Sequence, residues 1–115
     1  MRNNKERWVI KAGSSLVAGT ESGINSLFIE SLVSQVNYLI EKDIEVIVVS
    51  SGAVAKGMQE LNLKDRPSTL HLLQAAAAIG QMGLINAYQK ELDKFGLKAA
   101  QVLISHDDIS NRKRY

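Results

Sequence analysis

Apolar residues along the chain form short blocks whose spacing changes between strand-like and helix-like. Residues 7–12 (RWVIKA) and residues 44–50 (IEVIVVS) are short, apolar and rich in β-branched side chains, which is typical of buried strands. The second block is apolar at successive positions, so it indicates a parallel strand that helices cover on both sides. A third strand is predicted over residues 98–105.

A helix is predicted between the first two strands, after a loop over residues 13–23 that is rich in Gly, Ser and Thr. Asn25 or Ser26 can cap this helix, because either side chain can accept a hydrogen bond from a free N–H of the first turn. Apolar residues then recur at helical spacing as far as Lys42. They are Phe28, Leu32, Val36, Leu39 and Ile40.

Two further helices are predicted after the second strand. A short helix covers residues 53–61, and a long helix begins at a cap formed by Ser68 or Thr69 and ends at Gly96. Small residues between positions 75 and 80 would let another element approach the long helix closely. Its apolar face consists of Leu72, Leu73, Ala76, Gly80, Leu84, Tyr88 and Leu92.

This order of strands and helices predicts a doubly wound α/β domain with a mainly parallel sheet. A last helix would start at Asp107 or Asp108 and has barely begun at Tyr115. Three strands are few for such a sheet, so we interpret the chain as part of a larger domain. Its uncovered strand edge and apolar helix faces would favour self-association into a homo-oligomer.

Composition excludes several classes of protein. The chain has 115 residues, of which 45% are hydrophobic and 23% charged, and this suits a soluble globular domain or a piece of one. The net charge of +2 indicates neither a nucleic-acid nor a membrane partner. Since cysteine is absent, disulfide scaffolds and thiol catalysis are excluded, and a cytoplasmic location is expected. The apolar stretch near the N-terminus is too short for a signal peptide or a membrane span.

The sequence Lys11-Ala12-Gly13-Ser14-Ser15 follows the first strand and can bind a phosphate. Ligands of open α/β sheets bind beyond the carboxyl ends of the strands. A glycine at this position lets the backbone approach closely, and the N–H groups that follow can point at phosphate oxygens. Lys11 would add a positive charge. The alternative is an ordinary strand end at which Lys11 extends into water.

The sequence Ser50-Ser51-Gly52-Ala53 follows the second strand and opens a helix. The first N–H groups of a helix favour an anion, and a serine hydroxyl beside them can donate to a carboxylate or phosphate. The alternative is that Ser50 or Ser51 only caps the helix. Both sequences lie at carboxyl ends of strands, so together they suggest transfer of a group between two anionic ligands.

Other polar residues are weaker candidates. His71 and His106 have neither cysteines nor clustered carboxylates near them in the sequence, so no metal site is predicted. The remaining side chains are interpreted structurally: helix caps at Asp107 and Asp108, a solvated face at residues 112–114, helix packing at Gln81 and an anchor at Trp8.

Four segments resemble the N-terminal part of the glutamate 5-kinases, a branch of the amino-acid kinase family. They are VIKAGSSLV (9–17), VVSSGAVAKG (48–57), LLQAAAAIGQMGLINAY (72–88) and AAQVLISHDDISNRKRY (99–115). The second and third are specific to glutamate kinases and to the related kinase domain of pyrroline-carboxylate synthase. The resemblance keeps the same order and spacing over almost the whole chain.

The resemblance implies transfer of the γ-phosphoryl group of ATP, which carries Mg²⁺, to the γ-carboxylate of L-glutamate, the first step of proline biosynthesis. It assigns ATP-phosphate binding to Lys11, Gly13, Ser14 and Ser15, with Lys11 also catalytic, and glutamate binding to Ser51, Gly52 and Ala53. Residues 1–115 would then be the N-terminal part of the kinase domain. The adenine pocket, the rest of the glutamate site and a C-terminal domain would lie beyond Tyr115.

Two other interpretations stay open at this stage. The chain can belong to an amino-acid kinase that acts on a different carboxylate. It can also be a non-catalytic remnant of such a kinase, which would serve as an interaction module.

Overall fold

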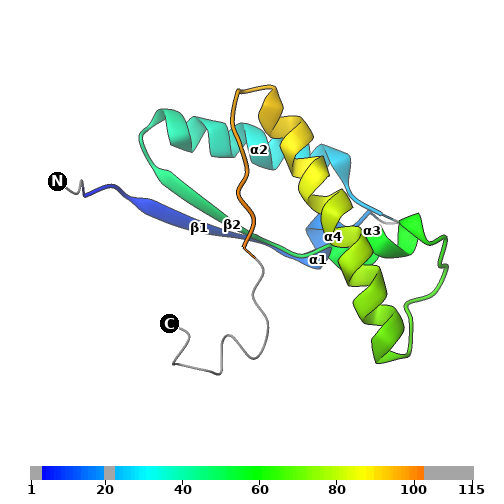
Figure 1. Ribbon diagram of the computed structural model, residues 1–115. Helices are drawn as coiled ribbons and strands as arrows, with labels where there is room; N and C mark the ends of the chain where they lie inside the picture. The colour runs from blue at the N-terminus through cyan, green and yellow to red at the C-terminus, as the bar shows by residue number, and fades with distance from the viewer. Residues whose placement is uncertain (1–3, 20–22, 103–115) are drawn as a thin grey trace, which may run out of the picture.

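The computed structural model describes residues 4–19 and 23–102 as two parallel strands and four helices (Figure 1). Strand β1 (Arg7–Ala12) pairs with β2 (Glu45–Ser50), and Ala12 lies opposite Ser50 at the carboxyl end of the pair. The helices are α1 (Ser14–Val17), α2 (Ser26–Glu41), α3 (Ala53–Glu60) and α4 (Leu70–Asp93). The predicted α/β class with a parallel sheet is confirmed.

Helices α2 and α4 lie over the same face of the sheet (Figure 1). Side chains alternate between the two faces of a strand, so Ile10 and Val48 point toward the helices and are half-buried. Val9, Ile47 and Val49 lie on the opposite face and are 64%, 46% and 52% exposed. Among the described residues, an apolar patch on this opposite face is therefore uncovered, with the charged side chains of Arg7, Lys11 and Glu45 on the same face.

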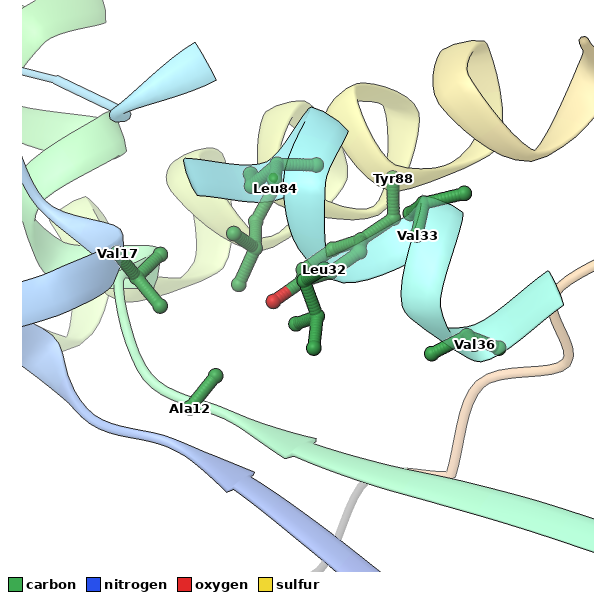
Figure 2. Close-up of a cluster of buried hydrophobic side chains, with 8 residues drawn as sticks. Ala12, Val17, Leu32, Val33, Val36, Leu84 and Tyr88 are labelled. Atoms are coloured by element: carbon green, nitrogen blue, oxygen red, sulfur yellow. The ribbon is translucent and has the colours of Figure 1, made fainter. Parts of the chain in front are cut away.

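The core lies between the sheet and three of the helices, as Figure 2 shows. Its buried members are Ala12, Val17, Ile29, Leu32, Val33, Val36, Leu84 and Tyr88. The predicted apolar face of α4 is confirmed at Leu84 and Tyr88, which are buried, whereas Leu72 is 50% exposed. The predicted face of α2 was correct at Leu32 and Val36 but did not include Ile29 and Val33, which are also buried, whereas the predicted Ile40 is 39% exposed.

Hydrogen bonds at the helix starts confirm the predicted N-caps of α2 and α4, whereas the C-cap of α4 is Lys94, two residues before the predicted Gly96. The side chain of Asn25 accepts a bond from the N–H of Phe28 at the start of α2. Thr69 does the same for Leu72 at the start of α4. Gly96 adopts a left-handed conformation (φ 69°) just after α4, where a glycine is least strained.

The prediction of a continuous loop over residues 13–23 was wrong at its start. Ser14–Val17 form the short helix α1, whose first carbonyl, that of Gly13, accepts bonds from the N–H groups of Leu16 and Val17. Val17 is completely buried. Tertiary packing of this one side chain stabilises a helical turn that the local composition does not favour.

The third predicted strand is not formed in its described part, residues 98–102. The side-chain amide of Gln89 on α4 bonds to this segment instead: it donates to the carbonyl of Leu97 and accepts from the N–H of Ala99, both at 2.9 Å. These backbone groups are therefore paired with a helix side chain and not with a strand. Residues 103–105 and the predicted last helix lie outside the described residues.

Helices α3 and α4 cross closely at the small residues that the sequence predicted as a site of close approach. A β-carbon on Gly57 would collide with the carbonyl oxygen of Ala76, and one on Gly80 would collide with that of Ala53. The two glycines thus let the helix backbones touch. As a result, Ala53 at the start of α3 is held against the long helix. No described helix is both long and apolar enough to cross a membrane.

Candidate functional site at the strand ends

The two candidate turns lie side by side at the carboxyl end of the sheet. The N–H of Ser51 donates to the carbonyl of Ala12 at 2.9 Å, so the backbone pairing of β1 and β2 continues into both turns. The side chain of Val17 then packs against Gly52. The predicted juxtaposition of the two sequences is therefore present in the fold.

The first turn presents backbone N–H groups and a lysine. The N–H groups of Ser14 and Ser15, at the start of α1, have no hydrogen-bond partner among the described residues, and both side chains are exposed. Lys11 is exposed one residue before the buried Ala12, so its side chain leaves the sheet on the face opposite α2. Its flexible stem would have to bend around the strand end for the ammonium group to reach an anion at the turn.

Gly13 has no packing role among the described residues. Its φ of −74° is accessible to any residue, and a β-carbon there would meet no described atom within 4 Å. The absence of a side chain leaves the backbone open to close approach from outside, which a phosphate group requires.

The second turn depends on Gly52. This residue has φ 116° and is the N-cap of α3, without a side-chain cap. Neither Ser50 nor Ser51 caps the helix, so the interpretation of these serines as simple caps is wrong. The N–H groups of Gly52 and Ala53 and the hydroxyl of Ser51 have no partner among the described residues.

Two partly buried hydrogen bonds that the sequence did not predict lie beside the second turn. The hydroxyl of Ser50 donates to the carbonyl of Ser51 at 2.9 Å and lies 2.8 Å from the hydroxyl of Tyr88 on α4. Tyr88 is only 8% exposed and belongs to the core cluster in Figure 2. Burial raises the pKa of its phenol, so the neutral form is favoured. The sequence signal that could have predicted this bond is a tyrosine on the apolar face of α4, because a buried tyrosine hydroxyl usually has a hydrogen-bond partner.

The other sequence candidates contribute little to this site. His71 is exposed near the start of α4, and residues 4–19 and 23–102 contain no group of three or more His, Asp or Glu side chains that could hold a metal ion. Trp8 is 47% exposed at the opposite end of β1, and its indole N–H donates to Glu6. Gln81 is half-buried on α4. The candidates from His106 onward lie outside the described residues.

Free N–H groups at two neighbouring turns can bind two anions. The helix ends behind them contribute partial positive charge. Serine hydroxyls add further donors, from the exposed Ser14 and Ser15 at the first turn and the half-buried Ser51 at the second. Such a geometry positions an acceptor and a donor for group transfer, chemistry in which positioning and charge stabilisation dominate.

Comparisons with known proteins agree with this arrangement. A model of the amino acid kinase family matches residues 6–115. The chain is 49% identical over 115 residues to a glutamate 5-kinase of Hydrogenovibrio crunogenus. This match covers 100% of this chain and 31% of that protein. It is 50% identical over 109 residues to a glutamate 5-kinase of Saccharophagus degradans, with 95% of this chain and 29% of that protein covered.

The chain thus spans less than a third of the length of the curated relatives that it matches. The family match includes β1, β2 and both turns at their carboxyl ends. Because it extends over nearly all of the sequence, the chain belongs to the amino acid kinase family.

Proposed function

We propose that this chain contributes the phosphate turn and the acid-binding turn of an ATP-dependent kinase that phosphorylates the γ-carboxylate of L-glutamate. The observation that carries the proposal is the bond between Ser51 N–H and Ala12 O, which brings the two turns together. Relatives named glutamate 5-kinase support the choice of glutamate over other acids. The reaction would be the first step of proline biosynthesis.

In this proposal the first turn binds the nucleotide phosphates. The N–H groups of Ser14 and Ser15 would donate to phosphate oxygens, and Gly13 would allow the backbone to come close. The Lys11 ammonium would approach the transferring phosphoryl group and stabilise the charge that shifts during transfer. Mg²⁺ would arrive with ATP, bound to its phosphates.

The second turn would bind the acceptor. The Ser51 hydroxyl and the N–H groups of Gly52 and Ala53 would donate to a carboxylate of glutamate. A γ-carboxylate oxygen forms a bond to phosphorus while the bond from phosphorus to the β,γ-bridging oxygen breaks. The products are ADP and γ-glutamyl phosphate, so no proton has to be removed from the carboxylate.

The substrate is tested on the full-length protein that contains this segment. ADP release from MgATP is measured with glutamate, aspartate and N-acetylglutamate, and hydroxylamine traps any acyl phosphate as a hydroxamate. We expect turnover and trapping with glutamate well above the other acids. Preference for another acid would replace glutamate as the substrate, and no turnover with any acid would favour a non-catalytic role.

The uncovered apolar face of the sheet supports self-association. Val9, Ile47 and Val49 form an exposed apolar patch on this face, and apolar surface of this kind favours contact with another chain. The proposed assembly is therefore a homo-oligomer.

A further inference from the structure

The hydroxyl of Ser50 takes part in two hydrogen bonds, one to a group that can only accept and one to a group that can donate or accept. It lies 2.9 Å from the carbonyl oxygen of Ser51, which can only accept, and 2.8 Å from the hydroxyl of Tyr88. A serine hydroxyl has a single proton, and that proton is directed to the carbonyl. Both bonds can be made at the same time only if Tyr88 is the donor in its bond to Ser50. The result is a directed chain from Tyr88 through Ser50 to the Ser51 carbonyl, which we call the Tyr88–Ser50 relay.

Both side chains of the relay are held in place by the fold. Tyr88 projects from the C-terminal part of α4 into the core and is 8% exposed (Figure 2). Ser50 is the last residue of β2 and pairs with Ala12. Since the ring cannot move without disturbing the core, the hydroxyl of Tyr88 is a fixed donor.

The relay fixes the direction of the peptide between Ser51 and Gly52. In a planar trans peptide the C=O and the following N–H point in opposite directions. The Ser51 carbonyl is turned inward to Ser50, so the N–H of Gly52 is turned away from the relay. The preceding peptide is also fixed, because the Ser51 N–H donates to Ala12. The relay and the strand bond together hold Ser51 from both sides.

We propose that Tyr88 is a positioning residue for the acid substrate: acting through Ser50, it orients the Ser51–Gly52 peptide so that the Gly52 N–H and the Ser51 hydroxyl meet the substrate carboxylate. This inference rests on the proposed function of the second turn. It adds a residue from α4, remote in sequence, to the acid-binding turn.

The kinetic test uses the full-length protein that contains this segment, with Tyr88→Phe, Ser50→Ala and the double variant. Tyr88→Phe removes the donor and keeps the buried ring. We expect the KM for glutamate to rise between about twofold and tenfold, the range that one neutral hydrogen bond produces, while the KM for MgATP and kcat stay within twofold. Tyr38→Phe is the matched control, because Tyr38 is 60% exposed on α2.

The double variant separates a relay from a general loss of stability. Since Tyr88 acts through Ser50, Tyr88→Phe should raise the KM for glutamate no further in the Ser50→Ala background. Independent, additive effects would overturn the proposal. So would an equal change in the KM values of both substrates, or no change in the KM for glutamate.

A second readout does not depend on turnover. With glycine-selective ¹⁵N labelling, the amide resonance of Gly52 should shift in the same direction in Tyr88→Phe and Ser50→Ala and stay in place in Tyr38→Phe. An unmoved Gly52 resonance in Tyr88→Phe would contradict the relay. If the wild-type protein turns over no glutamate, the proposed function fails, and the resonance alone decides whether the relay orients the turn.

Discussion

The side chain of Val17 occupies the space beside Gly52 so closely that a β-carbon on Gly52 would lie 2.6 Å from Val17 Cγ1. Val17 belongs to α1, the turn that follows β1, and Gly52 opens α3, the turn that follows β2. The contact therefore sets the spacing between the proposed phosphate turn and the proposed acid turn. Because Val17 is completely buried, this spacing is fixed by the core.

Gly52→Ala is expected to destabilise the protein for two reasons. The φ of 116° is strained for alanine, and the new β-carbon would overlap Val17. We expect a loss of about 2 kcal/mol or more in the free energy of unfolding, measured by urea denaturation. Val17→Ala relieves the overlap but not the strain, so Gly52→Ala should cost less in that background.

Gly13→Ala is the control for this prediction, because its φ is ordinary and a β-carbon there meets no described atom. Its unfolding free energy should stay within about 0.5 kcal/mol of the wild type. If Gly52→Ala lowers the unfolding free energy equally in the wild type and in the Val17→Ala background, overlap with Val17 is not a cause of the loss.

The crossing of α3 and α4 predicts that replacing two glycines by alanine has different effects on the free energy of unfolding. Gly57→Ala would push a β-carbon into the Ala76 carbonyl, and we expect a loss of about 1–3 kcal/mol in unfolding free energy. At Gly83 the atoms nearest to a β-carbon would not be backbone atoms but the side-chain atoms Glu60 Oε1, Lys56 Cε and Lys56 Cγ, which a change of rotamer can move aside. Gly83→Ala should therefore be neutral or stabilise the helix by up to about 1 kcal/mol. Thermal unfolding of both variants tests the crossing, and similar losses at both positions would contradict it.

Sequence patterns predicted the features that depend on local signals. The strands at residues 7–12 and 44–50 follow from β-branched apolar blocks, and the caps at Asn25 and Thr69 follow from side chains that accept backbone bonds. The small residues of α4 also predicted that another element packs closely against it, because a helix backbone can be approached closely only where its side chains are small.

Features that depend on distant contacts were not predictable in the same way. Helix α1 is stabilised by the burial of Val17, and residues 98–102 form no strand, with the Ala99 N–H bonded to the Gln89 side chain. The bond between Tyr88 and Ser50 joins residues 38 positions apart. The turns were located correctly from glycine and serine at strand ends, but which N–H groups stay free could only be seen in the fold. Their ligand-binding roles remain predictions.

The wild type and Tyr88→Phe are expected to differ in how their stability falls at alkaline pH. Burial raises its pKa above the ordinary value of 10.0, so the folded state favours the neutral donor. The resulting stability is fully present below pH 10.0 and is lost as the pH rises through the raised pKa. Urea denaturation from pH 8 to pH 11 should show a steeper alkaline decline in the wild type than in Tyr88→Phe. Parallel curves would mean that the phenol titrates normally.

The 115-residue chain alone should self-associate and show no glutamate kinase activity. Val9, Ile47 and Val49 form an exposed apolar patch on one face of the sheet. Sedimentation velocity should show a dimer or larger species. The double variant Val9→Lys, Val49→Lys should lower the associated fraction, because burying a charge in the contact is costly. Leu27→Lys is the control, since Leu27 is 77% exposed on α2. A clean 12.6 kDa monomer with a cooperative melt, or turnover above background, would contradict this prediction.

The claim that the two turns bind different substrates of one reaction is tested most directly by steady-state kinetics of Lys11→Ala and Ser51→Ala in the full-length protein, with Lys64→Ala as an exposed control. Lys11→Ala should lower kcat by about 10²–10³ and leave the KM for glutamate nearly unchanged, as for one lost donor to a developing charge. Ser51→Ala should raise the KM for glutamate about tenfold and leave the KM for MgATP unchanged, as for one lost bond to a charged ligand. If both variants alter the same parameter, or alter only thermal stability, the two-site account is contradicted.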